Sequence, residues 1–177
     1  MLTIKRVSSQ SELQIRHLLH SELISLEWEG EYKHFRRLYR EIYQSACDGR
    51  AVIWVADLDR IEIIGQLFIQ LESARVELAD GEKCAYIYGF RVKDSYHGQG
   101  VGSRLLKTAE VDLERRKFQW ITLNVSRDNL EARRYYKKRG FRIVAPEPGK
   151  WSYIDDKGAR IDVHDPSWRM KKRINPL

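Results

Sequence analysis

Hydrophobic and polar positions in the first fifty residues predict one short strand and two helices. In residues 2–7, apolar and polar positions roughly alternate, which is typical of a half-buried strand. Residues 9–26 carry apolar side chains at helical spacings, and Ser9 followed three residues later by Glu12 forms a capping box. A second helical pattern covers residues 32–46. We therefore expect this part of the chain to be mainly helical.

From residue 51 onward, the pattern predicts strands that alternate with helices. Segments rich in β-branched and aromatic residues predict four strands, at 51–57, 61–72, 83–92 and 119–125. Helical periodicity predicts one helix that starts at residue 101 and another over 128–141. The last predicted elements are a strand at 141–145, a hairpin over 151–163 that turns at 155–158, and a strand near 168–170. This order is typical of a mixed α/β or α+β domain.

Length, charge and cysteine content narrow the class of protein. The 177 residues fit one domain, and no apolar run approaches the roughly 20 residues of a membrane span. The first residues lack the apolar core of a secretion signal, so we expect a cytoplasmic protein. Cys47 and Cys84 form no metal or redox spacing and are expected to be buried thiols. His17 and His20 have no third ligand nearby in the sequence, so no metal is implied.

The net charge of +7 admits an anionic partner but does not identify it. Charge alone does not separate a nucleic acid from a cofactor that carries phosphate groups. No base-reading helix or stacked-aromatic signature points to nucleic acid. A nucleic-acid-binding module therefore stays an alternative of lower weight.

Three glycines at alternate positions, Gly98, Gly100 and Gly102, stand where a predicted strand leads into a predicted helix. Glycine lets the backbone approach a ligand closely, and the first N–H groups of a helix attract anions. The loop is not the phosphate-binding loop of a nucleoside triphosphatase, because the sequence Gly-Lys-Ser/Thr occurs nowhere in the chain. It is not a dinucleotide-binding loop either, because the acidic residue that such a loop needs is missing. A phosphate or diphosphate site and a merely tight turn remain.

Two motifs resemble those of the GNAT superfamily of acyl-CoA-dependent N-acetyltransferases. The segment 97–102, His-Gly-Gln-Gly-Val-Gly, is similar to the family's motif A, and 129–141 matches its pattern N-x-x-A-x-x-x-Y-x-K-x-G-F. The order of elements resembles that of the family over residues 3–173. The resemblance implies one domain with a mixed, mostly antiparallel sheet of six or seven strands, flanked by about four helices, with its central strands splayed for acetyl-CoA. It implies no metal.

The resemblance also implies direct transfer of an acetyl group from acetyl-CoA to a primary amine. The backbone N–H of Val92 is the expected oxyanion donor and Tyr136 the general acid, while the neighbouring Tyr135 is assigned to the core. The residues expected to bind the cofactor are Phe90, Arg91, Val92, His97, Gly98, Gln99, Gly100, Val101, Gly102, Ser103, Asn124, Asn129 and Tyr136.

His97 departs from the family pattern, which has Arg or Gln at this position. An imidazole is mostly neutral at pH 7, because its ordinary pKa is near 6.5. Two alternatives follow. Either part of the charge that would face the diphosphate is lost, with weaker cofactor affinity or an altered pH dependence, or His97 is an exposed residue without contacts.

The general base and the acceptor are left open by the sequence. Glu72 and Asp94 are candidate bases, and a water chain is an equal alternative. Acceptor contacts are expected from Glu27, Trp28 and Glu29, from Glu72, and from Trp151 in the predicted hairpin. These carboxylates slightly favour a small or polyamine-like cation over a protein N-terminus. A non-catalytic acyl-CoA sensor is the main alternative function, and a homodimer is the expected assembly if the chain is not monomeric.

Overall fold

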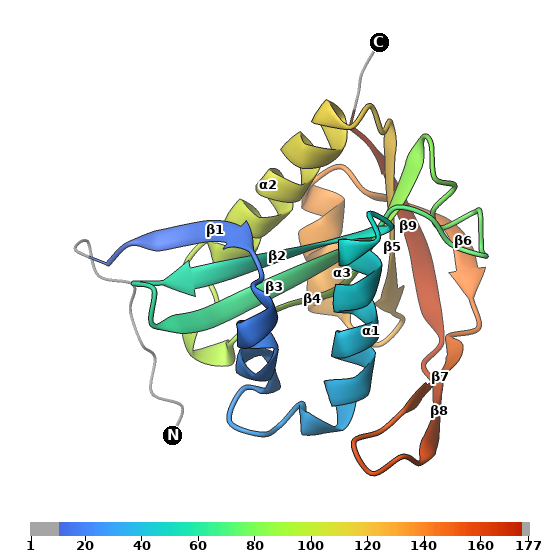
Figure 1. Ribbon diagram of the computed structural model, residues 1–177. Helices are drawn as coiled ribbons and strands as arrows, with labels where there is room; N and C mark the ends of the chain where they lie inside the picture. Colours follow the sequence, from blue (N-terminus) through green and yellow to red (C-terminus); the bar gives the residue numbers. More distant parts are fainter. Residues whose placement is uncertain (1–10, 175–177) are drawn as a thin grey trace.

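The computed structural model describes residues 11–174 and contains a seven-stranded sheet. The strands are ordered β1-β2-β3-β4-β5-β9-β6, and every neighbouring pair is antiparallel except β4 and β5 (Figure 1). Their bounds are β1 (Leu13–His17), β2 (Ala51–Leu58), β3 (Glu62–Gln70), β4 (Cys84–Val92), β5 (Trp120–Ser126), β6 (Arg142–Glu147) and β9 (Ser167–Arg173). A separate hairpin joins β7 (Lys150–Ile154) to β8 (Arg160–His164). The mixed, mostly antiparallel sheet is therefore confirmed.

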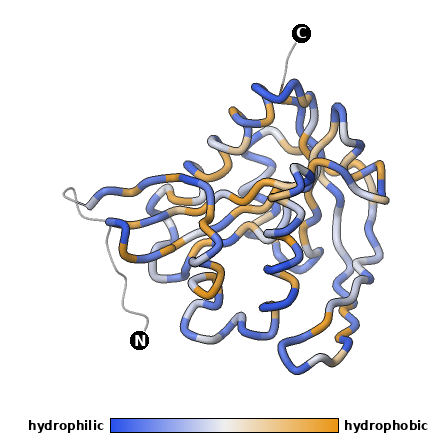
Figure 2. The backbone as a smooth tube through the Cα atoms, viewed as in Figure 1, coloured by the Kyte–Doolittle hydropathy of each residue, from blue (hydrophilic) through white to orange (hydrophobic). Residues whose placement is uncertain are grey.

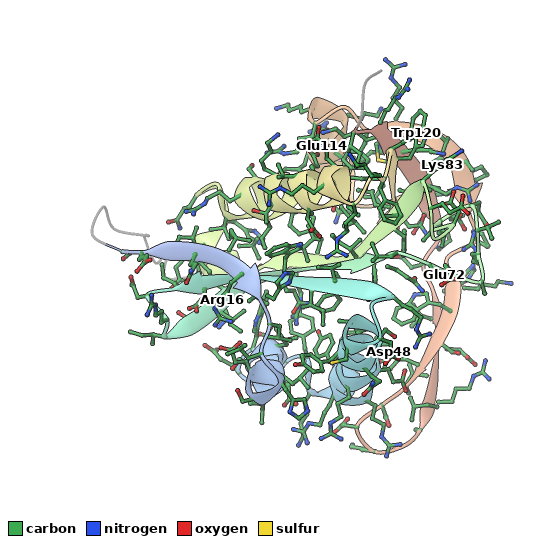
Figure 3. All side chains as sticks on the ribbon, turned by 45° about the horizontal axis from the view of Figure 1, so that its top comes forward. Arg16, Asp48, Glu72, Lys83, Glu114 and Trp120 are labelled. Carbon is green, nitrogen blue, oxygen red and sulfur yellow. The ribbon has the colours of Figure 1, made fainter. Side chains whose placement is uncertain are left out.

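Helical segments cover both faces of the sheet. The α-helices are α1 (Arg36–Cys47), α2 (Val101–Arg115) and α3 (Leu130–Lys138), and the 3-10 segments are η1 (His20–Glu27), η2 (Lys33–Phe35) and η3 (Asp94–Tyr96). Figure 3 shows α2 on one side of the strands, with η1 and α1 on the other. The three α-helices and η1 are the four larger helical elements expected around the sheet.

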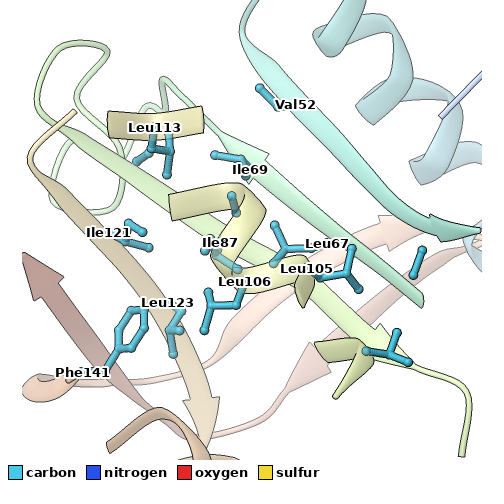
Figure 4. Close-up of a cluster of buried hydrophobic side chains, with 14 of the residues drawn as sticks. Val52, Leu67, Ile69, Ile87, Leu105, Leu106, Leu113, Ile121, Leu123 and Phe141 are labelled. Carbon is cyan, nitrogen blue, oxygen red and sulfur yellow. The ribbon is translucent and has the colours of Figure 1, made fainter. Parts of the chain in front are cut away.

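Two apolar clusters fill the space between these layers. The larger lies under α2, where Leu105, Leu106 and Leu113 pack against strand residues such as Ile87 and Ile121 (Figure 4). The smaller cluster lies under η1 and α1, and its buried residues include Leu26, Tyr39, Ile53, Val55 and Phe68. Figure 2 shows the hydrophobic stretches concentrated along the central strands. Burial of both sheet faces explains why β2 and β3 read as nearly continuous apolar runs.

The helix expected over residues 9–26 is wrong over residues 13–17, and only its last part is helical. Residues 13–17 form β1, which pairs with β2 in the register Leu13↔Leu58 to His17↔Trp54, and η1 follows as a 3-10 segment. The apolar residues in this region suit either structure, and pairing with the edge of β2 decides between them. The strand expected at residues 2–7, and the capping residue Ser9, lie outside the described residues.

The two cysteines differ in exposure. Cys84 is 5% exposed and its thiol donates to the carbonyl of Leu78, as expected of a buried thiol. Cys47 ends α1 and is exposed, so the expectation that both are buried is wrong. The amphipathic α1 directs its last residue to solvent.

β4 and β5 separate at their C-terminal ends. Their parallel pairing runs from Cys84↔Trp120 to Ile87↔Leu123, although β4 continues to Val92 and β5 to Ser126. On its other side, β4 has a bulge, because Gly89 and Phe90 together face Leu67 of β3. Beyond Ile87 and Leu123 the two strands are unpaired, which is the gap expected between the central strands.

Candidate functional site

A cavity of about 650 Å³ lies where β4 leaves β5. It is lined by Tyr32, Phe90, Arg91, Val92, Asp94, Tyr96, His97, Gly98, Gly100, Val101, Gly102, Ser103, Asn129, Glu131, Ala132, Tyr135, Tyr136 and Arg139. Most of the residues expected to bind the cofactor line this cavity. Gln99 and Asn124 are outside its lining: Gln99 donates to the carbonyl of Ser95, and Asn124 lies on β5.

The glycine loop forms an open cradle at the start of α2. Gly98 and Gly100 have φ angles of +74° and +81°, in the left-handed region where a side chain causes strain. A Cβ at either position meets nothing within 4 Å, so the space above both residues is open. α2 begins at Val101, and the first hydrogen bond back to the loop comes from Arg104 to Gly100. The preceding N–H groups are therefore free for an anion in the cavity.

Val92 directs its backbone groups into the gap between β4 and β5. The next residue, Lys93, donates its N–H to the carbonyl of Ile64 on β3, at 2.9 Å. Alternate residues of an antiparallel strand point their N–H and C=O groups in opposite directions. Val92 therefore faces away from β3, and its N–H is directed toward the cavity.

His97 is held against the end of β4. Its Nε2 donates to the carbonyl of Val92 at 2.8 Å, since a carbonyl only accepts, and it lies 3.6 Å from the carboxylate of Asp94. The side chain is 59% exposed. His97 thus has a contact that the sequence did not predict, and its ring is directed toward Val92 rather than toward the glycines.

Tyr136 and Tyr135 both contribute rings to the cavity wall. Tyr136 packs 6.4 Å from Phe90 and 5.7 Å from Phe141, measured between ring centroids. Burial raises the pKa of Tyr136 above its ordinary value, so the hydroxyl stays protonated at neutral pH. Tyr135, which we expected to be a core residue, lines the same cavity and places its hydroxyl 3.4 Å from the position of a Cβ on Gly102.

The side chain of Arg91 lies on the opposite face of β4 from Phe90 and Val92. Its guanidinium stacks between two rings, 3.9 Å from the centroid of Trp28 and 3.3 Å from that of Tyr32. It donates to the carbonyl of Leu26, the hydroxyl of Tyr39 and Oε1 of Gln66. Burial lowers the pKa of Arg91 from its very high ordinary value, which leaves the group cationic at neutral pH.

The acidic segment expected to receive a cation is partly neutralised. Glu27 is 7% exposed and accepts two hydrogen bonds from Arg36, at 2.6 and 2.9 Å. The Arg36 guanidinium lowers the pKa of this carboxyl. Trp28 covers Arg91, and only Glu29 of the expected contacts in this segment is exposed. The pair with Arg36 was not expected from the sequence.

Glu72 and Trp151 lie outside the cavity lining. Glu72 follows the end of β3 that is remote from Val92 and bridges to Asp80 (Figure 3). It stands six residues beyond Gln66, the partner of Arg91, which corresponds to about 20 Å along a strand. Asp94, the other candidate base, does line the cavity and is exposed.

Trp151 belongs to an aromatic group that joins the β7–β8 hairpin to the start of α1. Its ring lies 5.4 Å from Tyr153, and Tyr153 lies 4.9 Å from Phe35. Phe35 in turn stacks 6.2 Å from Tyr32, which reaches the cavity. Trp151 is 45% exposed, so this aromatic group leads from solvent toward Tyr32 and Arg91.

Among residues 11–174 there is no group of three or more His, Cys, Asp or Glu side chains that could hold a metal ion. Within the same range, no helix is both long enough and apolar enough to cross a membrane.

Comparison with known proteins identifies the family of the chain. The model of the acetyltransferase (GNAT) family matches residues 17–141, which is well over half of the chain. The chain belongs to the GNAT acetyltransferase family. It is therefore an acetyl-CoA-dependent N-acetyltransferase, as the two sequence motifs indicated. No curated protein matches the chain.

Solved structures share the fold of this GNAT acetyltransferase at low sequence identity. Ard1 from Thermoplasma volcanium has a TM-score of 0.70 and 19% identity, over 93% of this chain and 99% of Ard1. The ribosomal-protein-S18-alanine N-acetyltransferase from Escherichia coli has a TM-score of 0.69 and 16% identity, over 94% and 96%. Arabidopsis thaliana NAA60, in complex with acetyl-CoA, has a TM-score of 0.69 and 22% identity, over 93% and 100%.

The cavity has the features that acetyl-CoA requires. The cradle of Gly98 and Gly100 leaves room for a diphosphate beside the free N–H groups of α2. The separation of β4 from β5 exposes backbone groups along which an extended arm can pair. Val92 and Tyr136 line the same cavity as this cradle.

Proposed function

We propose that this acetyltransferase transfers the acetyl group directly to an acceptor amine that is bound beside the cofactor. The amine nitrogen forms a bond to the acetyl carbon, the bond between that carbon and the sulfur breaks, the amine gives up one proton, and CoA departs as a thiol. The observation that carries the proposal is the presence in one cavity of an N–H donor at Val92 and a protonated hydroxyl at Tyr136. Direct transfer needs one donor for the carbonyl oxygen and one for the sulfur, and these two groups supply them.

The two groups have separate tasks. The N–H of Val92 stabilises negative charge on the carbonyl oxygen, a contribution of about 2.7–4 kcal/mol for a well-placed donor. The hydroxyl of Tyr136 donates its proton to the sulfur. The departing thiolate takes up a proton at neutral pH, because the pKa of its thiol is near that of cysteine, about 8.5. The raised pKa of Tyr136 keeps that proton available over a wide pH range.

The acceptor that suits the site best is an α-amine with a carbonyl group nearby, such as a peptide N-terminus. Arg91 is one of the charged residues that line the cavity, and the nearby Glu27 is paired with Arg36. A buried guanidinium repels a polycation and attracts a carbonyl or carboxylate oxygen. The ion pair between Glu27 and Arg36 also neutralises one of the carboxylates for which the sequence favoured a polyamine-like acceptor.

An α-amine also needs less help from a base than an ε-amine does. Deprotonating an amine of pKa about 7.8 costs about 1 kcal/mol at pH 7, whereas an ε-amine of pKa about 10.4 costs about 4.6 kcal/mol. Water and weakly basic groups are sufficient for the first but not for the second. The aromatic group from Trp151 to Tyr32 offers apolar walls for the first side chains of a peptide.

The test is thiol release from acetyl-CoA with three classes of acceptor. These are peptides with free N-termini, the same peptides blocked at the N-terminus but containing lysine, and polyamines. We expect turnover on the first class only. Faster turnover on polyamines would contradict the α-amine proposal and would favour a cationic acceptor that binds at Glu29 and its neighbours. Binding of acetyl-CoA without turnover on any acceptor would favour the non-catalytic sensor.

A further inference from the structure

The glycine loop of this chain lacks a side chain that brings positive charge to the cofactor phosphates. Nε2 of His97 is engaged with the carbonyl of Val92 and lies near the carboxylate of Asp94. The backbone N–H groups of α2 carry only partial charges, and a diphosphate carries at least two negative charges. A cation from another element would complete the site.

Arg139 stands at the C-terminal end of α3 and is directed toward the start of α2. Its NH2 group donates to the hydroxyl of Ser103, in the first turn of α2, and its NH1 group donates to the carbonyl of Tyr135 at 3.2 Å. The guanidinium carbon lies 3.4 Å from the centroid of the Tyr135 ring. These contacts hold the side chain in one orientation across the gap between α2 and α3.

The guanidinium of Arg139 is available to a ligand. Arg139 lines the cavity together with the glycine loop. Its bonds to Ser103 and Tyr135 use two of the five N–H donors of the group, and three remain. No carboxylate among residues 11–174 forms an ion pair with it. Glu110, the acidic residue that interacts with Tyr135, is held by Lys172 at 2.6 Å.

We propose that Arg139 binds the diphosphate of acetyl-CoA and supplies the cationic charge that His97 does not. A guanidinium fixed by stacking loses little entropy when it binds a phosphate oxygen. The hydroxyl of Ser103 positions it above the free N–H groups of α2. The inference rests on acetyl-CoA as the cosubstrate and is independent of the identity of the acceptor.

Calorimetric titration of the purified protein with CoA tests this role without any turnover. We expect Arg139→Gln to weaken CoA binding about 10-fold and to make it less sensitive to salt, as expected when one charge contact is lost. Arg134→Gln is the matched control, because Arg134 is exposed on the same helix, outside the cavity, and its loss changes the net charge equally. The control is expected to change affinity less than 2-fold.

Two further measurements separate the outcomes. Arg139→Lys keeps the charge without the planar donors, so its affinity for CoA is expected to lie between those of the wild type and Arg139→Gln. Thermal melting shows whether each variant is folded.

The loss of affinity caused by Arg139→Gln is expected to be the same for 3′-dephospho-CoA as for CoA. A penalty that disappears with 3′-dephospho-CoA would overturn the diphosphate assignment in favour of the 3′-phosphate. Equal losses in the Arg139 and Arg134 variants would overturn the proposal. Failure of the wild type to bind CoA would instead challenge the function itself.

Discussion

The rings of Tyr135 and Tyr136 meet edge to face, with 5.4 Å between centroids and 84° between planes, and both line the cofactor cavity. Consecutive residues of a helix point about 100° apart, so one of two neighbours usually leaves a shared site. Here the cavity extends around the side of α3. Tyr136 packs against Phe90 and Phe141. Tyr135 lies close to Gly102, and the guanidinium of Arg139 stacks on its ring. The two rings therefore line different parts of the cavity wall.

Tyr136→Phe is expected to lower kcat about 100-fold, because general acid catalysis contributes about 10²–10⁴-fold. The ring and its packing remain, so CoA affinity measured by calorimetry is expected to stay within 2-fold. Tyr135→Phe is the matched control, since it removes a hydroxyl from the adjacent residue of the same cavity. It is expected to change kcat by less than 3-fold. A larger loss of kcat in Tyr135→Phe than in Tyr136→Phe would assign the proton donor to Tyr135.

The bulge at Gly89 predicts a large difference between two glycine substitutions. Gly89 has a φ angle of +54°, and a Cβ there would overlap the ring of Phe68. Gly49 has a φ angle of +74° with nothing within 4 Å of the same position. Gly49→Ala therefore carries only backbone strain, about 1–2 kcal/mol. Gly89→Ala adds overpacking, for a total of about 3 kcal/mol or more.

Urea unfolding of the two variants measures this difference. Gly89→Ala also moves Val92 relative to the cofactor cradle, because the bulge sets the direction of the strand end. A loss of kcat is therefore expected in Gly89→Ala but not in Gly49→Ala. Equal destabilisation of the two variants would show that Phe68 moves aside at no cost.

The sequence predicts the elements of the proposed cofactor site more accurately than those of the proposed acceptor site. β4, α2, β5 and α3 lie within a few residues of their predicted bounds, because each combines strong periodicity with a glycine or a cap at its end. Asn129 accepts from the N–H of Ala132, as a helix cap should. Local signals decide these elements, so one sequence is sufficient to find them.

The proposed acceptor site depends on contacts between residues that are distant in the sequence. β1 forms because it pairs with β2, some 40 residues later in the chain, and no local pattern distinguishes it from a helix. The neutralisation of Glu27 depends on how the 28–35 segment turns back to bring Arg36 near. The roles of Arg139 and Tyr32 in the cavity likewise follow from the packing of α3 and of this segment. Such contacts have no signature at a fixed spacing.

The different environments of the two cysteines predict selective modification. Cys47 is exposed, whereas Cys84 is buried, donates to Leu78, and has a pKa raised by burial. A thiol reagent is expected to label one cysteine rapidly in the native protein and the second only after unfolding. Cys47→Ser should abolish the rapid phase, and Cys84→Ser should leave it unchanged. Two rapid phases in the native protein would mean that the sheet end around Cys84 opens easily.

Buried tyrosines predict how stability depends on pH in the alkaline range. Of the nine tyrosines, six have a pKa raised chiefly by burial, namely Tyr39, Tyr86, Tyr88, Tyr96, Tyr135 and Tyr136. The pKa is raised to about 12 for Tyr39, Tyr86 and Tyr96. In the unfolded chain these groups ionise near pH 10. Folding therefore favours the neutral form, and its contribution to stability is complete below pH 10 and is lost as the pH rises toward 12.

Absorbance at 295 nm, which reports tyrosinate, measures this directly. At pH 11 the native protein is expected to show clearly less tyrosinate than the same chain in concentrated urea. The missing signal should appear at higher pH together with the loss of near-UV circular dichroism, because the buried rings ionise only as the fold opens. Reversal on return to pH 8 excludes chemical damage as the cause. If all nine tyrosines ionised near pH 10 while the dichroism stayed native, the rings around the cofactor cavity would be in contact with water, and the proposed protection of the Tyr136 proton would fail.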